Sequence, residues 1–84
     1  MKKSNLRDLL NMFKWHPNYT LEDVSIIYVN RPKGLSILKG SEIERVGYKF
    51  IYLKSGAAIP FHRVVEVRYK NKTFWKKIYQ DYKD

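Results

Sequence analysis

The spacing of turn-forming residues constrains this chain more than any other feature. After His16-Pro17, turns containing Gly, Pro, Asn or Ser recur every 6–12 residues, which leaves runs of strand length rather than helix length. Only the segment before His16-Pro17 has a helical pattern, with apolar residues on one face of a period of about 3.6 residues: Leu6, Leu9, Leu10 and Phe13. We therefore predict an α+β fold in which an N-terminal helix, about residues 5–15, packs on a small antiparallel sheet.

The remaining runs are rich in β-branched and aromatic residues and predict a meander of about five strands within residues 24–77. The candidate runs are 24–29, 36–39, 48–53, 57–59, 64–69 and 73–77. Residues 60–63 are expected to form a turn, because Pro60 has no N–H to donate to a ladder. A sheet this small can also curl into an SH3-like barrel, which the sequence leaves open. Residues 1–84 are predicted to form a single domain with a polar tail at 78–84.

Composition excludes several classes of protein. The chain has no cysteine, so it has no disulfide framework, no thiolate zinc site and no cysteine nucleophile. No apolar run approaches the ~20 residues that span a membrane, and no apolar segment follows the N-terminus, so we expect a cytoplasmic protein without a signal peptide. The four glycines are too scattered for a phosphate loop, and no metal-ligand motif occurs. Neither a metal nor a cofactor is expected.

The net charge of +9 is the first positive indication of function. Residues 46–84 hold nine of the 17 basic residues but only three of the eight acidic ones, and such an excess is typical of nucleic-acid-binding proteins. Aromatic residues lie among these cations in two places: residues 63–77 hold six basic residues and one acid together with Tyr69, Phe74 and Trp75, and the 48–53 run holds three aromatics beside Lys49 and Lys54. Exposed aromatics beside cations can stack bases and hold phosphates. Lys39 is a further expected phosphate contact.

Two alternatives come from other functional classes. His16 and His62 are the only histidines, and two imidazoles on one phosphate can cleave RNA by general acid–base catalysis without a metal. That reading, a small ribonuclease or cyclic phosphodiesterase, requires both rings within reach of one phosphate. The other alternative is a protein-interaction module whose basic surface is incidental, which would expose an apolar patch.

Several segments, taken in order, resemble the archaeal RNA cyclic-group end-recognition domain family. They are the runs 9–17, 27–31, 40–43 and 59–69, followed by Trp75. The most specific are Lys-Trp-His-Pro, ending at Pro17, and Ile-Pro-Phe-His-Arg, ending at Arg63. The resemblance covers about residues 6–77, nearly the whole chain.

The resemblance implies a binding module rather than a catalyst, one that recognises RNA ends carrying a 2′,3′-cyclic phosphate. Family domains are also fused to phosphoesterases of the 2′-5′ RNA ligase class, which implies an RNA-processing enzyme as a partner. The motif positions that carry over as phosphate-binding candidates are His16, Arg31, His62 and Arg63. Asn30 stands where the family motif commonly has histidine, and can donate to a phosphate oxygen without carrying charge. The adjacent aromatic ring of Tyr28 can stack a terminal base.

Overall fold

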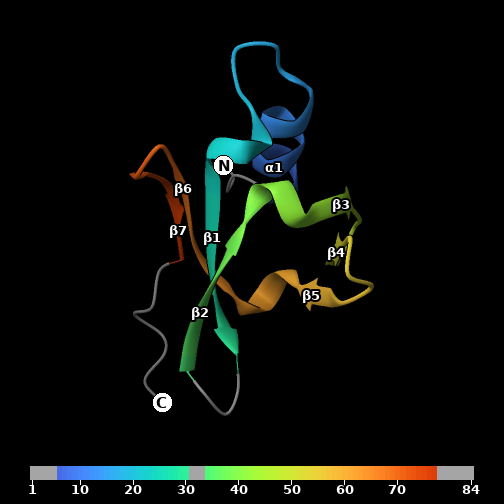
Figure 1. Ribbon diagram of the computed structural model, residues 1–84. Coiled ribbons are helices and arrows are strands. Elements are labelled where there is room, and N and C mark those ends of the chain that lie inside the picture. The colour runs from blue at the N-terminus through green and yellow to red at the C-terminus, as the bar shows by residue number, and fades with distance from the viewer. Residues whose placement is uncertain (1–5, 31–33, 78–84) are drawn as a thin grey trace.

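The chain folds into one N-terminal helix and two antiparallel sheets in a computed structural model that describes residues 6–30 and 34–77 (Figure 1). The predicted α+β class is therefore confirmed. The helix is α1 (Leu6–Trp15), and three short 3-10 helices are η1 (Leu21–Asp23), η2 (Gly40–Glu42) and η3 (Phe61–Arg63). The strands are β1 (Val24–Asn30), β2 (Gly34–Lys39), β3 (Ile43–Val46), β4 (Phe50–Leu53), β5 (Ala58–Pro60), β6 (Val64–Tyr69) and β7 (Lys72–Lys76).

The strands are divided between a larger sheet, ordered β2-β1-β6-β7, and a smaller one, ordered β3-β4-β5. Both passages between the sheets run through a 3-10 helix, since η2 joins β2 to β3 and η3 joins β5 to β6. These tight turns redirect the chain out of one ladder and into the other. The described strands consequently form two sheets and do not close into the SH3-like barrel that the sequence left open. They number seven rather than about five: six overlap the six candidate runs, and the seventh, β3, lies at residues 43–46, where no strand was expected.

The turn at η2 requires a glycine. A Cβ on Gly40 would overlap the carbonyl oxygen of Leu21 and come within 2.8 Å of the Val24 Cβ. Gly40 is itself buried, so η1 and η2 pack backbone against backbone. This close approach fixes the position at which the chain leaves the larger sheet.

The helix contributes its apolar face to the core. Leu10 and Phe13 are fully buried and Leu6 nearly so, whereas Leu9 is only partly buried, so three of the four predicted helix positions are core residues. The other core residues come from both sheets: Val24, Ile26, Leu38, Ile43, Ile51, Ile59, Val64, Val67 and Tyr69. A single core thus joins α1 and the two sheets.

Four rings, which we call the aromatic cluster, tie the end of α1 to the larger sheet: Phe13, Tyr19, Tyr69 and Phe74. Phe13 stacks on Tyr69 with ring centroids 5.0 Å apart. The Tyr69 hydroxyl accepts a hydrogen bond of 3.2 Å from the backbone N–H of Thr20. Tyr69 pairs with Val24, so the aromatic cluster lies where β1 begins, at the opposite end of that strand from Asn30.

Candidate functional site

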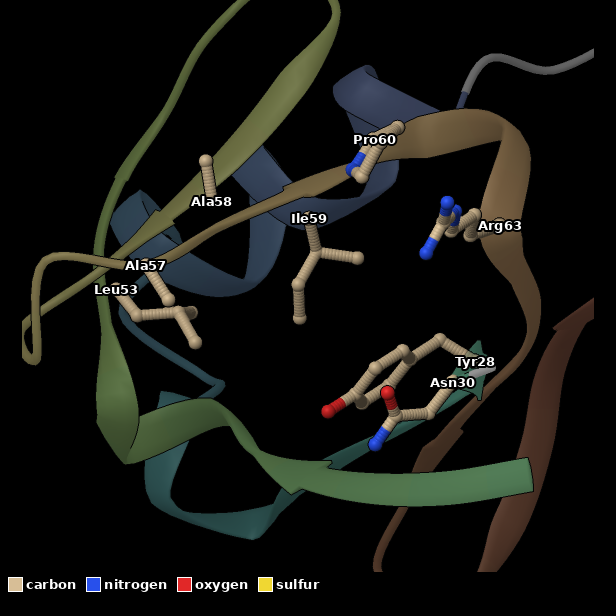
Figure 2. A pocket seen from close by; sticks show the side chains of 8 residues that line it. All are labelled: Tyr28, Asn30, Leu53, Ala57, Ala58, Ile59, Pro60 and Arg63. Carbon is tan, nitrogen blue, oxygen red and sulfur yellow. The ribbon is translucent and has the colours of Figure 1, made fainter. Parts of the chain in front are cut away.

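A pocket of about 210 Å³ opens between the far end of β1 and the β4–β5 hairpin (Figure 2). Its lining combines three polar residues of β1 and η3 with the apolar wall of the hairpin: Tyr28, Asn30, Arg63, Leu53, Ala57, Ala58, Ile59 and Pro60. This volume lies below the ~300–1,000 Å³ of pockets that enclose drug-sized ligands. It suits one terminal group, such as a ribose phosphate or a base, rather than several nucleotides.

The polar side chains of the pocket converge because of strand periodicity. Tyr28 and Asn30 are two residues apart on β1, and alternate residues of a strand share a face. Figure 2 shows both extending from β1 toward the space that the Arg63 guanidinium and the Ile59 side chain enter from the other side. The lining contains one cation and no carboxylate, so its electrostatic character favours an anion.

Arg63 belongs to η3 and is exposed. It makes no ion pair with any residue in the described ranges, where the ion pair present joins Arg68 to Glu66 at 2.9 Å. Glu66, the acidic residue nearest to Arg63 in the sequence, is already engaged by Arg68. Hydrogen bonds from Arg68 and Thr73 hold the pKa of Glu66 below its ordinary value. The guanidinium of Arg63 is therefore available to an external anion.

Asn30 keeps part of its hydrogen-bonding capacity. Its Nδ2 donates to the Ser36 hydroxyl at 3.0 Å across the β1–β2 pair, and the amide group carries a second N–H and a carbonyl oxygen. The hydrogen bond to Ser36 holds the Asn30 side-chain amide in one orientation. A positioned N–H is a suitable donor to a phosphate oxygen next to the Arg63 guanidinium.

His62 lies beside Arg63 in sequence but does not line the pocket. A 3-10 helix has three residues per turn, so neighbouring side chains on η3 project about 120° apart. The His62 side chain is exposed, and its carbonyl oxygen accepts a hydrogen bond of 2.6 Å from Lys77 Nζ. His62 and Lys77 together add a second basic position next to η3.

His16 lies at the other end of the molecule. Its ring is 5.3 Å from that of Tyr19 in the aromatic cluster, and its Nδ1 accepts a 3.1 Å hydrogen bond from the backbone N–H of Asn18. His62 belongs to η3, and Val64, the residue after η3, pairs with Tyr28. Tyr28 is four residues along β1 from Val24, so the two positions on β1 are about 13 Å apart at ~3.3 Å per residue. The structure thus does not bring His16 and His62 onto one phosphate.

Lys39 also lies away from the pocket. Lys39 pairs with Ser25, whereas Asn30 pairs with Gly34 at the opposite end of the β1–β2 ladder. Arg31 lies outside the described residues. The described residues contain no group of three or more potential metal ligands. Within residues 6–30 and 34–77 no helix has the length and apolar character needed to cross a membrane.

The apolar wall of the pocket was not identified from the sequence. Residues 57–59 were expected only as a returning strand, and alanine carries no chemical signal of a binding site. Ala57 and Ala58 nevertheless matter, because their small side chains leave the space that the pocket occupies. A glycine-containing turn followed by small residues was the available signal, and it is a weak one.

The fold and the pocket define a small basic α+β domain with an anion-suited cavity at the junction of its two sheets. The chain belongs to the family described as the MJ1316 RNA cyclic group end recognition domain, whose model matches residues 1–77. The family resemblance noted from the sequence segments is thereby confirmed.

Three archaeal proteins to which the chain is similar are each designated a "UPF0248 protein". One from Archaeoglobus fulgidus is 47% identical over 68 residues, which are 81% of this chain and 99% of that protein. Another from Metallosphaera sedula is 39% identical over 72 residues, covering 86% of this chain and 91% of the relative. A third, from Saccharolobus islandicus, is 33% identical over 78 residues, covering 86% and 98%. No solved structure matches the chain.

Proposed function

We propose that this protein is an RNA-binding module that recognises RNA ends carrying a 2′,3′-cyclic phosphate. One observation carries the proposal: Tyr28, Asn30 and Arg63, three residues of the family-like segments, line one pocket that contains no carboxylate. The description of the family supplies the ligand class. We assign that ligand to this pocket.

The chemistry of the pocket suits a cyclic phosphate. This group is a compact monoanion with two free oxygens, and a guanidinium can donate to both in a planar fork. Asn30 can donate a further N–H, the Tyr28 ring can stack against the terminal base, and the hairpin wall can cover the ribose.

The geometry favours recognition over catalysis. Metal-independent cleavage requires an acid and a base within hydrogen-bond reach of the same phosphate, and His16 and His62 lie near opposite ends of β1. A domain that binds a cyclic phosphate end without cleaving it needs a separate enzyme to act on that end. We propose that the domain works with an RNA-processing or repair enzyme in the cytoplasm.

The test compares three RNA oligomers of one sequence that end in a 2′,3′-cyclic phosphate, a 3′-phosphate or a hydroxyl. Arg63→Lys keeps the charge but loses the fork, so affinity for the cyclic end should fall by about 1–3 kcal/mol. Affinity for the hydroxyl end should change much less, since that RNA presents only backbone phosphates. Fluorescence anisotropy at one fixed salt concentration measures the affinity for each of the three oligomers.

Arg68→Lys is the matched control. Arg68 lies on β6, five residues from Arg63, and its guanidinium already binds Glu66, so this substitution should leave the difference between the ends intact. Equal losses for cyclic and hydroxyl ends in Arg63→Lys would reject end recognition. Opening of the cyclic phosphate by the wild-type protein, abolished by His16→Ala or His62→Ala, would replace the proposal with the enzyme hypothesis.

A further inference from the structure

A second basic and aromatic surface lies on the side of β3 and β4 that faces away from the pocket. It is a shallow hollow of about 530 Å³, which we call the outer surface, lined by Arg7, Arg45, Val46, Gly47, Tyr48, Lys49, Phe50 and Tyr52. The alternation of β4 separates the two sites. Ile51 is fully buried in the core and Leu53 lines the pocket, whereas Phe50 and Tyr52 line the outer surface.

Two of the aromatic rings on the outer surface are each covered on one face by a guanidinium. The Arg7 guanidinium carbon lies 4.3 Å from the Tyr48 ring centroid, and that of Arg45 lies 4.1 Å from the Tyr52 ring centroid. Arg45 and Tyr52 are also direct cross-strand partners in the β3–β4 ladder. A stacked guanidinium keeps the N–H groups at its edge free to donate in its own plane.

The rings remain accessible. Tyr48 lies in the turn between β3 and β4 and is 81% exposed, and Phe50 is exposed beside it. The Tyr52 ring lies over Gly47, where a Cβ would come within 2.9 Å of its Cε2 atom. Glycine in the turn therefore lets the Tyr52 ring approach the backbone closely, next to Phe50, whose ring centroid is 6.1 Å from that of Tyr52.

The electrostatics of the outer surface favour an anionic ligand. Its lining has three cations, Arg7, Arg45 and Lys49, and no carboxylate.

We propose that the outer surface binds single-stranded RNA away from its end, with bases stacked on Tyr48 and Phe50 and phosphates held by Arg7, Arg45 and Lys49. Exposed aromatic rings interleaved with cations are how proteins hold single strands without reading sequence. This inference deepens the proposed function and rests on RNA being the ligand. The pocket would read the terminus, and the outer surface would supply affinity for any strand.

The experiment uses the full chain and the hydroxyl-ended oligomer, whose binding does not depend on end recognition. Tyr48→Ala should weaken its binding by roughly 5- to 100-fold, the range expected when one stacked base loses its platform. Tyr48→Phe keeps the ring and should bind like the wild type. Arg45→Gln should weaken binding and reduce the dependence on salt by about one phosphate contact.

Trp15→Ala is the matched control, because Trp15 is 75% exposed and has Lys14 Nζ 5.7 Å from its ring, but lies at the opposite end of α1 from Arg7. Unchanged binding in Tyr48→Ala, or an equal loss in Trp15→Ala, would overturn the inference. So would displacement of the RNA by polyglutamate at an equal charge concentration, which would indicate an acidic protein partner.

The two proposals fail in different ways. If Tyr48→Ala reduces affinity for cyclic and hydroxyl ends by the same factor, the outer surface is confirmed and the preference for an end is a separate property. If the wild type shows no preference for an end, but Tyr48→Ala binds RNA more weakly than the wild type does, end recognition is rejected and the outer-surface proposal stands.

Discussion

Removing the Leu10 side chain tests the architecture on which both sites depend. Leu10 is fully buried and belongs to the core that joins α1 to the two sheets. Leu10→Ala deletes three buried carbons and leaves a cavity that neighbouring groups fill only in part, which costs about 2–5 kcal/mol. A domain of this length has a total stability of roughly 4–13 kcal/mol, at ~0.05–0.15 kcal/mol per residue. The substitution should thus remove a large fraction of it.

In thermal unfolding followed by circular dichroism, a loss of about 3 kcal/mol should lower Tm by roughly 12–24 °C, at ~4–8 °C per kcal/mol for a domain of this size. Urea unfolding should show a lower midpoint with an unchanged slope, because the surface exposed on unfolding is nearly the same. Leu35→Ala is the control: Leu35 is 65% exposed on β2, so the same substitution there should change stability by less than about 0.5 kcal/mol. Equal losses at the two positions would refute the packing of α1 on the sheets.

Two further predictions concern charge. If Arg7, Arg45, Lys49 and Arg63 each contact one phosphate, the slope of log K against log salt for single-stranded RNA should be roughly −3, at about −0.7 per contact; a slope near zero would exclude phosphate contacts as the source of affinity. The Arg68 and Thr73 hydrogen bonds lower the pKa of Glu66, so the stability that they supply is fully present above the unfolded carboxyl value and is lost as pH falls through the folded value. Glu66→Gln should therefore unfold more easily than the wild type at pH 7, and the difference should shrink below about pH 4 in parallel urea titrations. A difference that grows in acid would contradict this assignment.

Local patterns predicted most of the elements, because helices and strands each have their own periodicity. The helix was expected at about residues 5–15 and occurs as Leu6–Trp15, and β6 occurs as predicted at Val64–Tyr69. The missed strand, β3, reads Ile43-Glu44-Arg45-Val46. Its ladder has a register irregularity between Ile43 and Arg45, and this interrupts the alternation that reveals a strand. A strand of four residues with charges at its centre carries little pattern of its own.

The site was predicted only in part, because sequence motifs give residue order but not strand register. Tyr28, Asn30 and Arg63 meet at the pocket because β1 and β6 pair with Tyr28 opposite Val64. The antiparallel register of β1 and β2 puts Lys39 at the end of that ladder far from the pocket. His16, in an equally specific segment, lies near the aromatic cluster. The pairing of strands that are distant in the sequence decides which of these residues meet, and the sequence of a single strand does not reveal its partner's register.

The β3–β4–β5 unit is the part of the fold that connects the two sites. Successive residues of β4 alternate between the outer surface and the pocket side, so one strand contributes to both. The turn before β4 is also bonded directly to η3, through a 2.9 Å hydrogen bond from the Phe61 N–H to the Lys49 carbonyl oxygen. Arg63 follows Phe61 on the same turn of 3-10 helix. Lys49 and Arg63 are therefore held at a fixed separation by backbone contacts, on opposite sides of the small sheet. An RNA strand bound on the outer surface would have to pass around the small sheet for its end to reach the pocket. Binding to both sites at once would therefore depend on the length of the RNA.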